Sequence, residues 1–282
     1  MKKLVTAFAA CALAGLAFAQ VESVNIVGYS TASLAAGYNM IGVNFEAVGA
    51  TDGKVSIQDL VSATGLTGVD WGTVSGGDQL LIWDASNQFY PVFYSWTGAD
   101  ADTALGTTGV NNKWVDLGTF DGTAATVPTL LVPAGSAAWI VRTSGTAASL
   151  VFSGQVKQGG GSQTLSQGYN MFANALPVDL AMNNSAQVTC AGLAGVDWGT
   201  VSGGDQLLVW DASNQYYPVF YSWTGADADT ALGTTGVSNK WVDLGTFDGT
   251  AATVPAVTIP VGGGAWIVRT AATAASITTA GL

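Results

Sequence analysis

The chain has 282 residues, with 19 acidic against 8 basic side chains for a net charge of −11, no histidine and two cysteines. A chain without histidine cannot form Ser-His-Asp or Cys-His catalytic groups, or histidine-ligated zinc, copper and iron sites. The acidic charge, with scattered lysine and arginine, argues against nucleic acid and anionic lipid as partners.

Residues 1–19 predict an export signal. Lys2 and Lys3 precede an apolar run at residues 4–16, and Ala17-Phe18-Ala19 forms a small-x-small cleavage site. The run is too short to span a bilayer, and we predict no transmembrane segment after it. Cleavage would leave a net charge of −13 and Cys190 as the single cysteine, which excludes an intramolecular disulfide. We therefore expect an exported protein that is extracellular, on the cell surface or periplasmic.

The rest of the chain is a tandem repeat. Residues 68–128 return as residues 195–255 at an offset of 127, with three differences, and the Gly-Tyr-Asn-Met motif at 37–40 returns at 168–171. The unit has the length of one domain and is too long for a solenoid repeat. We predict copy 1 at residues 20–155, a Gly-rich boundary at 156–162 and copy 2 at 163–282.

Short apolar and β-branched runs between turn residues predict strands along each copy. In copy 1 the expected strands are residues 24–29, 37–43, 79–83, 89–96, 114–117, 126–132, 137–143 and 150–152. Residues 55–63 have helical spacing, which predicts a short helix capped by Ser56. Pro91 predicts an edge strand or a bulge, because proline cannot donate to a ladder. The pattern predicts an all-β chain of two tandem β-sandwich (or partly closed barrel) domains, each with one short helix.

Two short motifs recur in both copies. Copy 1 opens with Gly37-Tyr38-Asn39-Met40 and closes with Pro133-Ala134-Gly135 followed by Trp139-Ile140-Val141-Arg142. They resemble β-sandwich modules that recur in secreted bacterial surface proteins. The resemblance implies an extracellular accessory or structural module, with no catalytic residues to carry over.

Tryptophan is abundant, with five of the ten residues in each copy. Exposed tryptophan and tyrosine can stack on sugar rings, whereas alternating aromatics on strands also fill cores, and we expect core packing for most. The platform of interest is Trp83, Phe89, Tyr90, Tyr94 and Trp96, and we expect Trp71 and Trp114 to be exposed. The candidate ligand-binding residues are Trp71, Tyr90, Tyr94, Trp114, Trp198, Tyr217, Tyr221 and Trp241. Cys190 is expected to be a small buried residue rather than a reactive thiol.

The carboxylates suggest weaker candidates. Asp100, Asp102, Asp227 and Asp229 alternate with alanine in Gly-rich loops, and alternate carboxylates suit calcium. The spacing lacks the glycine and terminal glutamate of an EF-hand, so a solvated acidic loop is the favoured interpretation. Asp84 and Asn87 are expected to bond their own backbone in a turn. A glycosidase would need two carboxylates in a cleft, for which Asp70, Asp78 and Asp116 are the candidates. We expect no enzyme and no catalytic residue.

We therefore predict an exported, non-catalytic structural or surface-assembly protein whose partner is itself, the envelope or the extracellular matrix. Contact between domain one of one chain and domain two of the next could propagate, and near-identical neighbours favour domain swapping. The alternative is a carbohydrate-binding or adhesive protein, in which two weak polysaccharide sites gain avidity. A third hypothesis is a calcium-stabilised module.

Overall fold

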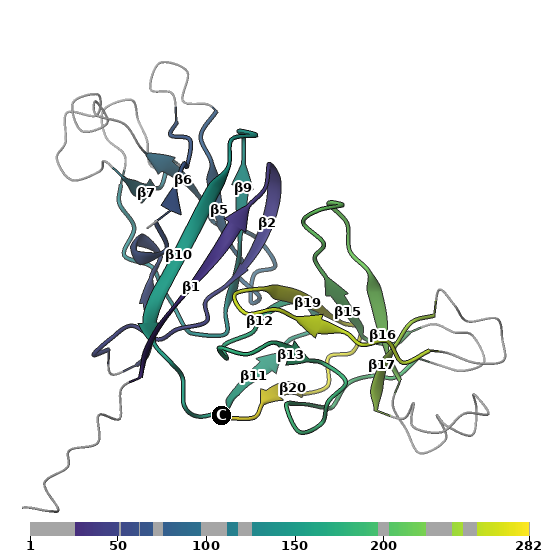
Figure 1. Ribbon diagram of the computed structural model, residues 1–282. Helices are drawn as coiled ribbons and strands as arrows, with labels where there is room; N and C mark the ends of the chain where they lie inside the picture. Colours follow the sequence, from purple (N-terminus) through teal and green to yellow (C-terminus); the bar gives the residue numbers. More distant parts are fainter. Residues whose placement is uncertain are drawn as a thin grey trace, which may run out of the picture.

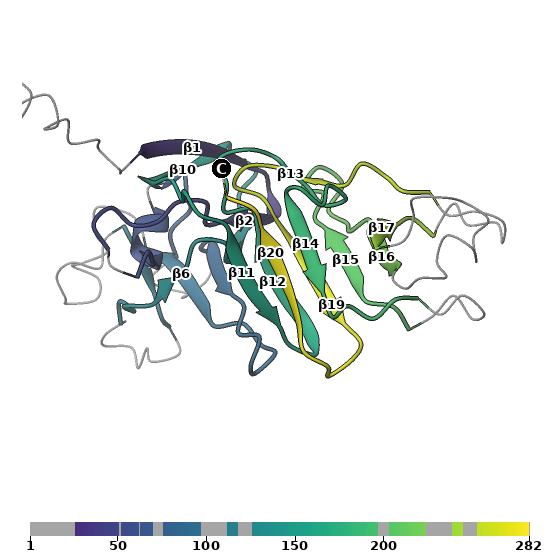
Figure 2. The ribbon, with the colours of Figure 1, turned by 90° about the horizontal axis from the view of Figure 1, so that it is seen from below.

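The computed structural model describes residues 26–50, 52–61, 63–69, 76–96, 112–117, 126–196, 203–223, 239–244 and 253–281. These residues form an all-β structure of several antiparallel sheets (Figure 1), so the predicted class is confirmed. We call residues 26–155 the N-terminal half and residues 161–281 the C-terminal half. Figures 1 and 2 show them side by side, coloured purple to teal and teal-green to yellow. No helix among the described residues is long and apolar enough to cross a membrane.

Each half contains a five-stranded sheet with the same strand order. In the N-terminal half the order is β2 (Gly37–Gly42), β9 (Ala137–Arg142), β5 (Gln79–Ile82), β6 (Val92–Trp96) and β7 (Lys113–Val115). In the C-terminal half it is β12 (Gly168–Ala173), β19 (Gly264–Arg269), β15 (Gln206–Val209), β16 (Val219–Trp223) and β17 (Lys240–Val242).

Smaller sheets complete each half. A three-stranded sheet has the order β1 (Val27–Leu34), β10 (Ala148–Gln155) and β4 (Ala63–Thr64), and its counterpart is β11 (Gly161–Leu165), β20 (Ala275–Thr279) and β14 (Val188–Ala191). Two-stranded sheets pair β3 (Val55–Ser56) with β8 (Leu131–Val132), and β13 (Leu180–Ala181) with β18 (Thr258–Ile259).

Each half has its own hydrophobic core between the five-stranded and three-stranded sheets. In the N-terminal half, Ile41, Leu80 and Ile140 of the larger sheet pack with Leu150 and Phe152 of β10. In the C-terminal half the corresponding cluster includes Phe172, Leu207, Ile267 and Ile277. Alternate residues on a strand point to opposite faces of the sheet. Because the side chains at positions 41, 80 and 140 face the core, the neighbouring residues of the same strands face the other side, where a second contact can form.

The recurring Asn of the Gly-Tyr-Asn-Met motif secures the corner between the two sheets. Asn39 Oδ1 accepts the Ala35 N–H at 2.8 Å, and Nδ2 donates to the carbonyls of Ala35 and Ile140. Asn170 makes the equivalent bonds to Ser166 and Ile267. At this corner the Asn amide bonds the backbone N–H and carbonyl groups of neighbouring residues. Asparagine is favoured at this position because a buried backbone group without a hydrogen bond is costly.

The predicted helix is only partly correct. Residues Ile57–Val61 form a 3₁₀ helix, and the Ser56 hydroxyl accepts the Gln58 N–H at 3.2 Å as predicted for the cap. In the C-terminal half the same segment is not helical among the described residues, because it forms β13, a turn and β14. Asn183 there makes the contacts that Gln58 makes in the N-terminal half, since each amide bonds both backbone groups of the following Trp114 or Trp241.

Of the two alternatives predicted for Pro91, an edge strand or a bulge, the edge strand is wrong. Strand β6 lies between β5 and β7, and Pro91 precedes it. Pro91 keeps one bond of its pair with Ile82, because its carbonyl accepts the Ile82 N–H at 3.2 Å, and gives up the reverse bond because it has no N–H.

Candidate functional site

The larger sheet of each half presents an aromatic face to the other half. In the N-terminal half this docking face is made by Met40, Trp83, Tyr90, Ala137 and Trp139. In the C-terminal half the equivalent positions are Met171, Trp210, Tyr217, Gly264 and Trp266, and the two faces pack into one cluster around β2, β9, β12 and β19. Figure 1 shows these four strands where the halves meet.

The ring contacts across the docking face are reciprocal. Trp83 meets Trp266 edge to face with ring centroids 5.1 Å apart, and Trp210 meets Trp139 at 5.0 Å. Tyr90 lies 6.2 Å from Trp266, and Tyr217 lies 6.2 Å from Trp139. Equal contacts in both directions are the mark of an isologous, two-fold interface, here formed within one chain. Edge-to-face aromatic pairs contribute about 0.5–1.5 kcal/mol each beyond their buried area.

Hydrogen bonds cross the docking face in the same reciprocal way. The Trp83 indole N–H donates to the Tyr169 carbonyl at 2.9 Å, and the Trp210 indole donates to the Tyr38 carbonyl at 3.1 Å. The Gln88 amide pairs with both backbone groups of Tyr169, accepting its N–H at 2.9 Å and donating to its carbonyl at 3.1 Å. Gln215 pairs with Tyr38 in the same way.

Gln88 and Gln215 occupy a left-handed backbone conformation, each with φ of 54°. Such a conformation is uncommon for a residue other than glycine. The preceding turn is fixed by Asp84, whose carboxylate accepts the N–H groups of Ser86 and Asn87, as predicted for Asp84. The Asn87 amide donates to the Asp84 carboxylate at 2.9 Å rather than to the backbone, so that part of the prediction is wrong. The turn therefore aims the Gln88 amide at the backbone of β12.

Two backbone hydrogen bonds close the centre of the contact. The Gly42 N–H donates to the Gly262 carbonyl at 2.7 Å, and the Ala173 N–H donates to the Gly135 carbonyl at 2.9 Å. Gly135 and Gly262 both have positive φ, at 93° and 72°. The recurring Pro-x-Gly turn thus turns a carbonyl toward the opposite half, which is a physical reason for its glycine.

Burial between the halves raises the pKa of Tyr90 to about 12 and raises the pKa of Tyr217 as well. Each phenol oxygen accepts an indole N–H at 3.1 Å, from Trp139 and Trp266 respectively, which opposes the shift. Desolvation is the larger effect because the charged phenolate loses water on burial.

We expect Tyr90 to ionise at about 12 rather than at the ordinary tyrosine value of 10.0. Between these values the unfolded chain loses the proton first, so the free energy of unfolding falls as pH rises above about 10. Below that range the stabilisation is fully present. Ultraviolet titration should show tyrosines that ionise above the ordinary pH range, and Tyr90→Phe and Tyr217→Phe should each reduce their number by one. A wild-type titration in which every tyrosine ionises in the ordinary range would contradict the burial.

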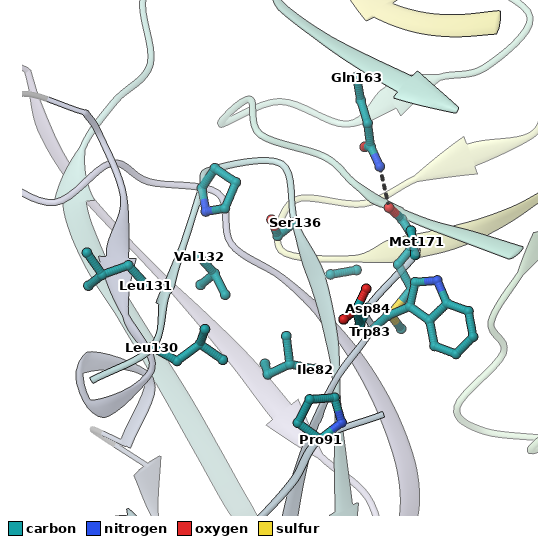
Figure 3. A pocket seen from close by; sticks show the side chains of 13 residues that line it. Ile82, Trp83, Asp84, Pro91, Leu130, Leu131, Val132, Ser136, Gln163 and Met171 are labelled. Carbon is teal, nitrogen blue, oxygen red and sulfur yellow. Dashed lines mark hydrogen bonds between the residues drawn. The ribbon is translucent and has the colours of Figure 1, made fainter. Parts of the chain in front are cut away.

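A groove lies at the margin of the docking face, where Trp83 and Met171 border it and Gln163 of β11 lines it (Figure 3). Its volume is about 370 Å³. Leu130, Leu131 and Val132 lie on one side, and Trp83 and Met171 on the other. Asp84 and Ser136 also line it, and the Gln163 amide donates to the Met171 carbonyl at 2.8 Å. The lining therefore combines an apolar floor with a few polar groups, as ligand sites commonly do.

The predicted aromatic residues have three different environments. Tyr90 and Tyr217 lie in the docking face, and Tyr94 and Tyr221 are half-buried. Trp114 and Trp241 are buried in the cores, with 0% and 3% exposure, so the expectation that Trp114 is exposed is wrong. Trp114 lies in the short strand β7 (Lys113–Val115). This strand packs against the 3₁₀ helix, and the packing buries the indole. Trp71 and Trp198 lie outside the described residues.

The platform centred on Trp83 is also not one exposed surface. Phe89 is exposed, Trp83 and Tyr90 pack between the halves, and Trp96 is buried. The hairpin therefore places its aromatic side chains against protein rather than in a single open row.

Two of the described carboxylates, Asp78 and its equivalent Asp205, are buried in ion pairs. Asp78 forms a fully buried ion pair with Arg142 at 2.8 Å, and Asp205 pairs with Arg269 at 3.3 Å. Asp116 forms a β-bridge with Thr126, and Asp70 lies outside the described residues. Within the described ranges no group of three or more metal-ligating Cys, Asp or Glu residues occurs. The calcium candidates Asp100, Asp102, Asp227 and Asp229 lie outside these ranges.

Cys190 packs against the C-terminal core, and burial raises its pKa to about 12. A thiol with a raised pKa holds little thiolate near neutral pH and is a poor nucleophile. The preference for a packed residue over a reactive thiol is consistent with this position.

Sequence reasoning missed Trp139, Trp266, Gln88 and Gln215 as contact residues. One signal was present for the tryptophans: residues 137–141 are continuously apolar, so β9 must be covered on both faces. Ile140 faces the core while Trp139 faces the other half. No comparable signal marks the glutamines, whose role depends on how the halves are placed.

No known protein family, curated protein or solved structure matches the chain. The function is therefore inferred from the contacts described above.

Proposed function

We propose that this chain is an exported, non-catalytic structural protein of surface assemblies, built from two near-identical β-sandwich domains. The observation that carries this proposal is the docking face, which each half presents in nearly the same form and which is complementary to the corresponding face of the other half. A surface that pairs with its own equivalent can join chains as well as the two halves of one chain. Its partners are copies of the chain itself, with the envelope or extracellular matrix as the surroundings.

The outer edge of β1 supports self-association. β1 is an eight-residue strand at the edge of its sheet, and in the described part of the chain no strand pairs with its other side. Val27 and Tyr29 are 61% and 79% exposed. A long unpaired edge strand is a template for pairing with another chain, most of all where its exposed side chains are apolar, as at the start of β1. The counterpart β11 is shorter.

Light scattering on the mature protein from producing cells tests this proposal. We expect large oligomers or polymers whose mass rises with concentration. Tyr29→Lys should lower that mass because a charge on the edge opposes strand pairing. Val178→Lys is the matched control, since Val178 is 42% exposed but lies outside the strands. A strictly monomeric protein at high concentration would count against assembly.

The groove beside the docking face favours one alternative, carbohydrate binding. Its lining combines the polar residues Asp84, Ser136 and Gln163 with apolar residues that include Trp83, a combination suited to a sugar ring. A screen of plant, algal and bacterial polysaccharides tests this function. Binding that is lost with Ser136→Ala would assign it to the groove, whereas loss with Trp71→Ala and Trp198→Ala would assign it to those residues. No binding to any polysaccharide would exclude the alternative.

A further inference from the structure

The partner that the docking face accepts in the structure is the opposite half of the same chain. We propose that in assemblies it accepts the opposite half of a second copy, so that chains exchange halves, and that four small residues at its centre exclude pairing of like halves. This inference rests on the proposed function of self-assembly. It names both the partner and the device that selects it.

The four residues are two glycines and two alanines in crossed positions. Gly42 and Ala137 are paired across β2 and β9, and at the equivalent positions Ala173 and Gly264 are paired across β12 and β19. A Cβ atom on Gly42 would lie 2.6 Å from the Gly263 carbonyl oxygen and 2.8 Å from the Ala173 Cβ, both in the opposite half. One on Gly264 would lie 2.9 Å from the Ala137 Cβ of the opposite half and 3.0 Å from the Phe172 carbonyl oxygen of its own half. Real Cβ atoms do not approach so closely, so each alanine needs a glycine opposite to it.

Like halves cannot meet this requirement at the same docking geometry. Two N-terminal halves would oppose Ala137 with Ala137, and two C-terminal halves would oppose Ala173 with Ala173, at the spacings of 2.9 and 2.8 Å given by the present contact. An N-terminal half with a C-terminal half avoids both clashes. The rest of the face is nearly identical in the two halves and does not discriminate, so these residues select the unlike partner by excluding the like one.

The connection between the halves provides a hinge for the exchange. The Val156 N–H donates to the Ile26 carbonyl of the N-terminal half, whereas Gly160 lies against the Thr279 carbonyl of the C-terminal half. Between them, nothing lies within 4 Å of the Cβ position of Gly159. Opening at this point leaves both cores intact, because each is built from one half. The exchanged pair then re-forms the same contacts between chains.

Complementation between two full-length variants tests the exchange. Gly264→Ala brings two methyl groups together within its own chain and should open the halves, whereas Ala137→Gly leaves its own contact closed. In an equimolar mixture, exchange would place position 137 of the Ala137→Gly chain, which has lost its methyl group, opposite position 264 of the Gly264→Ala chain, which has gained one. The remaining contact would be the native pair of Ala137 with Gly264, so both contacts are matched. We expect a 1:1 species with twice the mass of one chain, measured by light scattering on differently labelled proteins.

The same measurement contains its controls. An exchanged pair of Gly264→Ala with wild type would contain one matched contact. The closed wild-type chain already has that contact by itself, so this mixture should form no 1:1 species. The double variant Ala137→Gly/Gly264→Ala should be compact in small-angle X-ray scattering, which would show that alanine at position 264 is compatible with the fold.

The results separate this inference from the proposed function. An open Gly264→Ala protein that forms no mixed species would overturn the exchange, and a Gly264→Ala protein as compact as wild type would overturn the selection. Either result stands whether or not the wild-type chain polymerises, because light scattering on the wild-type protein decides the proposed function separately.

Discussion

Asp78→Ala is expected to lower the free energy of unfolding of the N-terminal half by about 3–5 kcal/mol, the usual cost of leaving a buried charge without its partner. Both side chains of the Asp78–Arg142 pair are fully buried, with the carboxylate oxygen 2.8 Å from Nε. The carboxylate also accepts the N–H groups of Thr67 and Thr143 at 2.8 Å. Alanine removes all these bonds together and leaves the guanidinium buried without its counter-charge. Urea denaturation followed by tryptophan fluorescence measures the loss.

Asp52→Ala is the matched control for Asp78→Ala. Asp52 also pairs with a basic side chain, Lys54, at 3.4 Å, but both side chains are about half exposed. Exposed ion pairs contribute little because water screens them. We therefore expect little change for Asp52→Ala, and similar losses for the two variants would contradict the assigned importance of burial.

The positions of most strands were predictable because they depend on local sequence. Residues 137–143 and 79–83 were expected as strands from their apolar and β-branched runs, and β9 and β5 occupy them. The Asp84 turn was predictable for the same reason, since its bonds join residues two and three positions apart. The Asp78–Arg142 pair was not predictable, because 64 residues separate its members and no local pattern links them.

The docking face was only half predictable. The apolar run around Trp139 shows that both faces of the strand need cover, yet the cover could be a second chain, a ligand or the other half. Which of these applies depends on the relative placement of the halves, and so does the function of Gln88. The crossed glycines and alanines also read as ordinary small residues until the distances between their Cβ positions are known.

Trp83→Ala/Trp210→Ala is expected to separate the halves. Each indole loses its hydrogen bond to the opposite backbone, at 2.9 and 3.1 Å, and its contact with Trp266 or Trp139. Both indoles are partly buried, so each loss should cost less than the roughly 3 kcal/mol of a core tryptophan, but both losses weaken the same docking equilibrium. Small-angle X-ray scattering should show a larger radius of gyration for the folded protein, and unfolding should divide into two transitions.

Trp96→Ala separates this effect from a general loss of stability. Trp96 is 2% exposed and packs with Val69 and Val115, away from the docking face. Its replacement should destabilise the N-terminal half while the folded protein keeps the wild-type radius of gyration. If the Trp83→Ala/Trp210→Ala protein also kept that radius, the indoles would not be what holds the halves together. The backbone bonds from Gly42 to Gly262 and from Ala173 to Gly135 would then hold the halves together with the amide bonds of Gln88 and Gln215. Exchange between chains would depend on these bonds and the four central residues rather than on the two indoles.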